Sequence, residues 1–194
     1  MTILPTHRVV SKLREFNWSE LRRHLEPWFT AESIEFGEDS SKDKAREELV
    51  RKLSAARTKR AIGAYPTADK EKRAFYVLTL RKGADLSRLL HNVSPLQREL
   101  DVVLLHDGIL EPGLGITPQS VKAEANLSYE REATAALDAV DSGAAQIAFL
   151  LNPCDVEEVV KIATAGEVMP QKSTDFYPKL MSGITMYSVD PERA

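Results

Sequence analysis

The sequence lacks the features that several protein classes require. A single cysteine, Cys154, in 194 residues excludes a fold held by disulfides. The longest uninterrupted apolar stretch, Ile147 to Leu151, is far shorter than the roughly 20 residues of a membrane-spanning helix. With 43% hydrophobic residues, 9 glycines and 10 prolines, the composition is neither disordered nor collagen-like. Residues 1–10 contain His7 and Arg8 and no apolar leader, so we expect a globular, cytoplasmic protein.

The small net charge of −3 conceals a strong asymmetry. Residues 1–100 contain 20 basic and 14 acidic side chains, whereas residues 101–194 contain 6 basic and 15 acidic ones. This length suits one domain with a substantial core. We therefore expect a single domain, 1–194, with a basic α+β part at 1–92 and an acidic α/β part at 93–194. Their opposite charges predict that the two parts face each other.

The fold class predicted from hydrophobic spacing is α/β, with mixed α+β character. Asn17 and Glu20 form a capping-box pattern, which predicts a short helix. Two runs separated by Pro66 and a polar tip predict an N-terminal β-hairpin. The expected helices cover 18–27, 40–56, 94–107, 130–140 and 156–165. The expected strands cover 61–65, 73–80, 121–127, 145–151 and 184–189. Because strand, helix and strand alternate after residue 120, we expect a mixed, partly parallel sheet with flanking helices.

A polar loop near the C-terminus is the strongest candidate for chemistry. It combines an amide, two lysine ammonium groups and two hydroxyls, as phosphate or carboxylate recognition requires. Its two lysines are among only six basic residues after position 100. The candidate anion-binding residues are Gln171, Lys172, Ser173, Thr174 and Lys179. The alternative is a surface loop whose lysines balance nearby carboxylates.

Three other features carry weaker signals. The basic stretch from Arg51 to Arg60 has no interleaved aromatic residues, and its charge suits a helix C-terminus, so we do not expect nucleic-acid binding. The four histidines include no pair at metal-ligand spacing, so we expect no metal site. Cys154 falls at a helix start, where the dipole lowers a thiol pKa, but no base is near it in sequence. We interpret this cysteine as incidental.

Several segments together resemble one known family. They are Ile3-Leu4-Pro5-Thr6-His7-Arg8, Ala148-Phe149-Leu150-Leu151-Asn152-Pro153, Gly166-Glu167-Val168-Met169-Pro170-Gln171-Lys172-Ser173-Thr174, Phe176-Tyr177-Pro178-Lys179 and Ser182-Gly183. From about residue 3 to residue 187 the chain resembles the bacterial and archaeal domain-of-unknown-function family numbered 1015. Members of that family are longer, and their N-terminal half carries an Asp-Gly-His-His-Arg signature similar to ParB-like and free-serine-kinase proteins. Asp175 and Cys154 depart from the family pattern.

The resemblance implies that this chain corresponds to the C-terminal half of such a protein, from a truncated or split reading frame or a misplaced start. It implies half of a nucleotide-dependent phosphotransferase for a serine-like amino acid, with or without Mg²⁺, that is inactive without its N-terminal half. His7 and Arg8 would lie near the junction with that half, which would be the main partner. The alternative is a non-catalytic scaffold or interaction domain that docks the missing half. Homo-oligomerisation is compatible with both interpretations.

Overall fold

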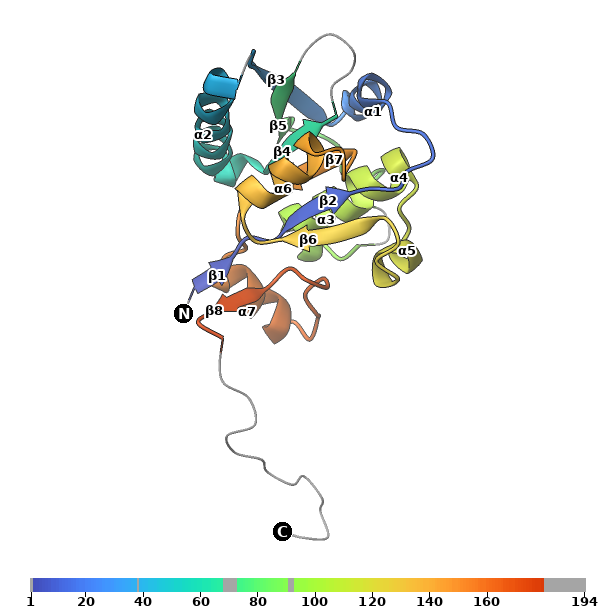
Figure 1. The fold of residues 1–194 in the computed structure, drawn as a ribbon. Helices are drawn as coiled ribbons and strands as arrows, with labels where there is room; N and C mark the ends of the chain where they lie inside the picture. The colour runs from blue at the N-terminus through green and yellow to red at the C-terminus, as the bar shows by residue number, and fades with distance from the viewer. Residues whose placement is uncertain (1, 38, 68–72, 91–92, 180–194) are drawn as a thin grey trace.

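A six-stranded sheet with the order β3-β5-β4-β7-β2-β6 forms the centre of the protein. The computed structural model describes residues 2–37, 39–67, 73–90 and 93–179 (Figure 1). The strands are Thr2–Leu4 (β1), His7–Val10 (β2), Phe29–Glu35 (β3), Ala61–Pro66 (β4), Ala74–Leu80 (β5), Leu127–Glu130 (β6), Ile147–Leu150 (β7) and Asp175–Tyr177 (β8). The α-helices are Trp18–Leu25 (α1), Asp39–Ala55 (α2), Asp101–Leu105 (α3), Glu111–Leu114 (α4), Pro118–Lys122 (α5), Ala133–Asp141 (α6) and Val156–Thr164 (α7). In the described part of the chain, no helix is both long and apolar enough to cross a membrane.

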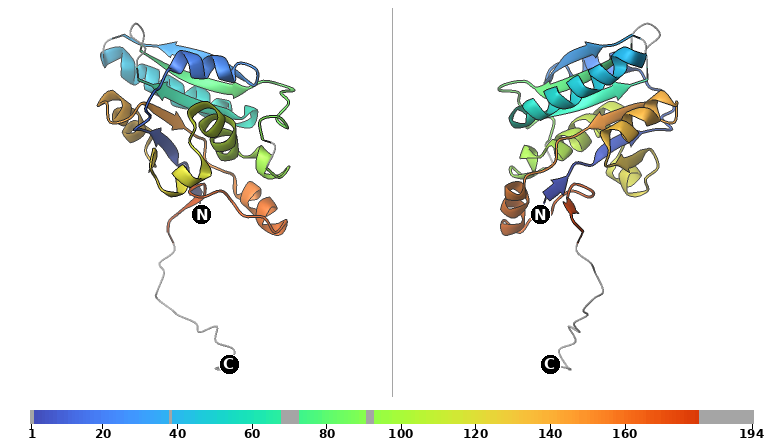
Figure 2. Two further views of the ribbon diagram at one scale, coloured as in Figure 1. Left: turned by 90° about the vertical axis from the view of Figure 1, so that its right-hand side faces the viewer. Right: turned by 60° about the vertical axis from the view of Figure 1, so that its left-hand side comes forward.

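Helices cover both faces of this sheet, and each face has its own apolar core (Figure 2). On one face, α1 packs with a helical segment that runs unbroken from α3 through a π-helical turn, His106–Leu110, into α4. On the other face, α2 and α6 pack against the strands. Because strand side chains alternate between faces, Val10 enters the first core and Val9 enters the second.

The mixed α and β class is confirmed, but the prediction of a partly parallel sheet is wrong. Every strand pair in the described residues is antiparallel. The expected strand-helix-strand unit is present as β6, α6 and β7. However, β2 lies between β6 and β7 and is antiparallel to both. The two strands therefore run in the same direction without pairing, and β8 pairs with β1 outside the main sheet.

The elements with strong local signals formed as expected. The Asn17 side chain caps α1 by accepting a hydrogen bond from the Glu20 N–H at 3.1 Å. Helices α2 and α7, the β4-β5 hairpin and the fully buried strand β7 also lie where the spacing predicts them. The strand expected at 184–189 lies outside the described residues.

Two predictions between residues 94 and 127 are wrong. The helix expected at 94–107 begins only at Asp101, after an extended Leu100, and continues through Gly108 to Leu114, where Gly115 ends it with a φ of +67°. Gly113 lets the helix lie close to α1, since a Cβ there would approach Cδ1 of Leu21 to 2.4 Å and the leucine side chain would have to move. The alternation at 121–127 was expected to be a strand. Instead, the Thr117 side chain caps helix α5, and the strand begins only at Leu127.

The two oppositely charged parts face each other, as the charge asymmetry predicts. Lys42 and Arg46 of α2 form ion pairs with Asp141 at the end of α6, and Arg46 also pairs with Asp138. Arg57 pairs in the same way with Asp155, which caps α7. In each case the cation comes from the first half of the chain and the carboxylate from the second. The sheet combines strands from both parts, since β2 pairs with β6 and β7.

Candidate functional site

A buried arginine on a central strand is the most unusual feature of the molecule. Arg8 lies on β2, between β6 and β7, and its relative exposure is 1%. It shares the sheet face of Val10, two residues further along the strand, because side chains alternate. The guanidinium therefore extends toward the helical segment of residues 101–114. A charged side chain at such a depth requires compensation.

The Arg8 guanidinium bonds only to uncharged acceptors among the described residues. Its Nε donates to Nε2 of His106 at 3.2 Å, and one terminal nitrogen donates to the carbonyl oxygen of Lys172 at 3.1 Å. The other terminal nitrogen donates to the carbonyl oxygen of Thr6. The Tyr129 ring centroid lies 5.2 Å from the guanidinium carbon. Of the five N–H donors of an arginine, one on each terminal nitrogen remains without an acceptor in this part of the structure.

Burial shapes the protonation of this region. It lowers the pKa of Arg8 to about 10, so the guanidinium stays charged at neutral pH. Burial, with the adjacent Arg8 charge as a second cause, lowers the pKa of His106 to about 3 and that of His7 to about 4. His106 is thus neutral, with Nε2 as the acceptor. His7 has a structural role, because its Nδ1 accepts the Leu151 N–H at 3.2 Å.

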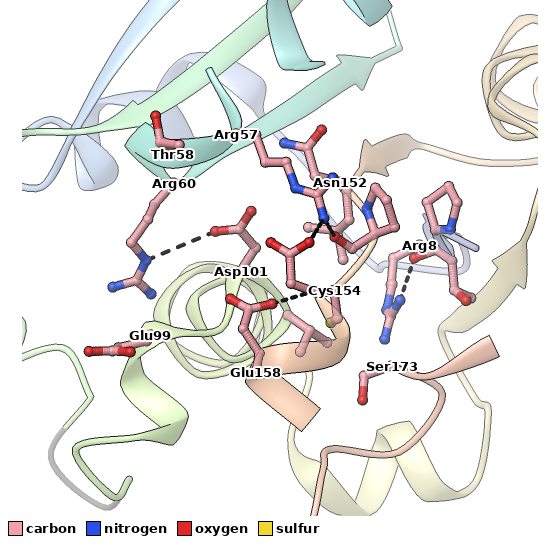
Figure 3. Close-up of a pocket in the computed structure, with 16 residues that line it drawn as sticks. Arg8, Arg57, Thr58, Arg60, Glu99, Asp101, Asn152, Cys154, Glu158 and Ser173 are labelled. Carbon is pink, nitrogen blue, oxygen red and sulfur yellow. Dashed lines mark hydrogen bonds and ion pairs between the residues drawn. The ribbon is translucent and has the colours of Figure 1, made fainter. Parts of the chain in front are cut away.

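Arg8 lines a cavity at this end of the sheet, with a volume of about 480 Å³. The cavity walls come from the segment before β2, the turn before β4, the start of α3 and the loop into α7. In Figure 3, Arg8 and Ser173 lie on one side, and Glu99, Asp101 and Glu158 lie across from them or between them and Arg60. Arg8 makes one end of the cavity cationic. The opposite end, which we call the acidic end, holds the carboxylates of Glu99, Asp101, Asp155 and Glu158 together with the guanidinium groups of Arg57 and Arg60.

The acidic end contains a carboxyl group with little compensation. Burial raises the pKa of Asp101 to about 7, and Glu158 raises it further, although Arg60 and Arg57 act in the opposite direction. The nearest Asp101 ion pair is long, at 3.9 Å from the Arg60 Nε. Arg57 is engaged with Asp155 at 2.5 Å. Asp101 is therefore partly protonated near neutral pH.

The predicted anion-binding loop does not converge on one cavity. Ser173 lines the 480 Å³ cavity, where its hydroxyl donates to the Pro170 carbonyl at 2.6 Å. Lys172, Thr174 and Lys179 line a separate cavity of about 240 Å³. Gln171 lines a third cavity, of about 370 Å³, beside His106. The structure thus distributes the five predicted residues over three hollows.

Lys172 contributes to the Arg8 site through its main chain. Its backbone has a φ of +57°, and its carbonyl accepts a hydrogen bond from Arg8. Its ammonium group instead lies 5.6 Å from the centroid of the Tyr129 ring. Asp175, which is near this lysine in the sequence, accepts one hydrogen bond from Arg131 at 3.0 Å and forms an ion pair with it. The loop positions Arg8 rather than presenting its own charges to the large cavity.

Sequence reasoning named Arg8 only as a junction residue and missed it as the centre of a site. The available signal was a charged residue inside the short apolar strand His7-Arg8-Val9-Val10. The helix start does not lower the pKa of the Cys154 thiol, so the structure gives no support to the alternative of a reactive cysteine. Burial raises its pKa to about 11, and Glu158 and Asp101 add to this shift. No cluster of three or more His, Cys, Asp or Glu side chains suited to a metal occurs in residues 2–37, 39–67, 73–90 and 93–179.

No family model, curated protein or solved structure matches the chain. The resemblance to domain family 1015 therefore stays a prediction. The buried, uncompensated charge of Arg8 in the wall of a cavity is the observation from which a function can be argued.

Proposed function

We propose that this chain binds a small anionic metabolite in the 480 Å³ cavity, with the guanidinium of Arg8 as the anchor. The main evidence is that Arg8 is 1% exposed and forms no ion pair with a carboxylate of the described residues. An unpaired buried ion costs several kcal/mol, and a bound anion offsets that cost. Arg8 is one of the residues that line the cavity, so an anion held there would lie next to this side chain.

The donor geometry supports a planar or tetrahedral oxyanion. Each terminal nitrogen of Arg8 has one N–H left, and a carboxylate or phosphate accepts two parallel hydrogen bonds from such a fork. The three acceptors already bound, on Thr6, His106 and Lys172, fix the plane of the guanidinium before the ligand arrives. This preorganisation reduces the ordering cost of binding.

The family resemblance implies nucleotide-dependent phosphoryl transfer to a small molecule. We propose that the anion bound at Arg8 is a substrate or product of this reaction. Transfer of this kind depends mainly on positioning and charge stabilisation, which a preorganised arginine supplies. Asp101, in the same cavity, has a pKa of about 7, the range in which a carboxylate accepts a proton from a substrate hydroxyl. The reaction is tested by following phosphoserine formation from serine with ATP or ADP and Mg²⁺, with and without the family's N-terminal half.

Isothermal titration tests the binding proposal. The ligands are ethyl phosphate and propionate, which separate a phosphate site from a carboxylate site. We expect one of them to bind the wild-type chain. Arg8→Lys should weaken that ligand about tenfold or more, because lysine cannot offer two parallel N–H groups.

The matched control is Lys172→Gln. This change removes the most prominent cation of the predicted loop but keeps the carbonyl that holds Arg8. The affinity of the Lys172→Gln chain for the same anion should stay within about threefold of the wild-type value. The reason is that the Lys172 ammonium of the wild-type chain lies outside the 480 Å³ cavity. Absence of binding to the wild-type chain, or equal affinity for the Arg8→Lys chain, would contradict the proposal.

A further inference from the structure

The large cavity has unsatisfied charges of both signs. At one end, Arg8 has two N–H groups without acceptors among the described residues. At the other end, Asp101 and Glu158 face the same space (Figure 3). A simple anion satisfies only the first of these ends.

The two arginines near the acidic end, Arg57 and Arg60, only partly offset its carboxylates. Arg57 pairs with Asp155, and its terminal nitrogen also donates to the Pro153 carbonyl at 3.0 Å. Arg60 approaches Asp101 only to 3.9 Å, and its Nε has no hydrogen-bond partner in the described structure. The Asp101 side chain is nevertheless only 17% exposed. The Asp101 carboxylate is therefore as buried as carboxylates that form close ion pairs usually are, but it has no close cationic partner among the described residues.

Glu158 adds a second carboxylate to this end. One of its oxygens accepts the Asp155 N–H at 2.7 Å as part of the capping box of α7, and this bond holds the side chain at the cavity wall. Glu158 lies close enough to Asp101 to raise the pKa of that carboxyl group. Two neighbouring carboxylates favour a cation between them.

Both ends line the same cavity, whose volume of about 480 Å³ is within the range of small-molecule sites. Cys154 lies between them in the cavity wall (Figure 3). A small molecule in this cavity therefore lies between the two ends.

We propose that the ligand also carries an ammonium group, so that the site selects amino-acid-like or aminated phosphate compounds over simple anions. Arg8 holds the phosphate or carboxylate, and Asp101 with Glu158 accepts hydrogen bonds from the ammonium. This inference rests on the proposed function, which assigns the anionic group of the ligand to Arg8, and it adds a binding position for the ammonium group.

Two ligand pairs that differ in the ammonium test it by isothermal titration. One pair is phosphoethanolamine and ethyl phosphate, and the other is β-alanine and propionate. For the pair that carries the correct anion, we expect the aminated member to bind about tenfold to a hundredfold more tightly, as charge-assisted hydrogen bonds allow. Equal affinities within a pair that binds overturn this inference and leave the anion site intact. No binding of any of the four compounds overturns the anion site as well.

Substitutions of single carboxylates test which of them cause the preference for the aminated ligand. Asp101→Asn or Glu158→Gln should reduce the preference for the aminated ligand to about threefold or less. The affinity for the ligand without the ammonium should not fall in either variant, because each change removes a negative charge from the cavity. Glu157→Gln is the matched control, because Glu157 is exposed on the same turn of α7 and does not line the cavity. Full retention of the preference in both cavity variants contradicts the assignment.

Discussion

Nε of Arg8 donates a hydrogen bond to Nε2 of His106 across 3.2 Å, joining the central strand to the π-helical turn of the facing helix. An imidazole that accepts at Nε2 carries its proton on Nδ1. A neutral histidine is a suitable partner here, because it orients the guanidinium without neutralising it. A carboxylate at the same place would leave no reason for an anionic ligand to bind. π-helical turns are frequent at functional sites, and this one positions the histidine.

His106→Leu should weaken both the fold and the site. The change leaves the Nε–H of Arg8 buried without an acceptor, which costs about 1 to 3 kcal/mol of unfolding free energy. Urea denaturation measures this loss, and titration with ethyl phosphate should show an affinity reduced about tenfold. His106→Gln, which retains an acceptor, should recover part of the affinity.

His24→Leu is the control for the two His106 variants, since His24 is exposed on α1. Its denaturation midpoint and its affinity should match the wild-type values. If His106→Leu also retained the wild-type affinity, His106 would have no positioning role.

The buried histidines predict a loss of stability in acid. The folded-state pKa values, about 4 for His7 and about 3 for His106, lie below the ordinary value of 6.5. Their contribution is present above pH 6.5 and is lost as the pH falls toward the folded values, at a limit of about 1.4 kcal/mol per pH unit for each histidine. Urea denaturation between pH 7 and pH 4 should show a shallower decline for His7→Gln than for the wild-type chain. Parallel curves would contradict a neutral, buried His7.

Asp101 predicts a change of the opposite sign. Its folded-state pKa of about 7 lies above the ordinary value of 3.8, so its contribution is present at low pH and is lost as the pH rises through 7. Asp101→Asn should therefore gain stability relative to the wild-type chain between pH 5 and pH 8. Urea midpoints at these two pH values measure the difference. A constant difference would show that this carboxyl group titrates normally.

Cys154 should react slowly in the folded protein. With a pKa of about 11, its thiol is ionised to about one part in a thousand at pH 8, and the thiolate is the reactive form. Alkylation by iodoacetamide, followed by mass spectrometry, should be far slower in buffer than in urea. Equal rates in the two conditions would contradict the protonated, half-buried thiol.

The parts of the fold that the sequence predicted are those with local causes. The Asn17 cap, the apolar face of α2 and the antiparallel pairing of β4 with β5 depend on residues close together in the chain. The insertion of β2 between β6 and β7 depends on pairing over more than a hundred residues, which periodicity does not contain. This single insertion explains why the sheet is antiparallel rather than partly parallel.

The candidate site was only partly predictable for the same reason. A loop rich in donors was visible at 171–174, but the alternating directions of its side chains send Ser173 and Lys172 into different cavities. Arg8 acquires its importance from partners about a hundred residues or more away, His106 and Lys172. A charged residue within a short apolar strand was the only local sign of it.

The most direct test of the central claim is the stabilisation that an anion gives to the folded chain. Urea denaturation is measured with increasing ethyl phosphate or propionate for the wild-type chain, for Arg8→Met and for Arg131→Met, whose exposed arginine pairs with Asp175 outside the large cavity. The account predicts that the ligand stabilises the wild-type and Arg131→Met chains, by about 2.7 kcal/mol at a hundred times Kd, and does not stabilise Arg8→Met. Arg8→Lys serves in its place if the methionine chain does not fold. Equal stabilisation of the Arg8 variant, or no stabilisation of the wild-type chain by either anion, would contradict an anion site at Arg8.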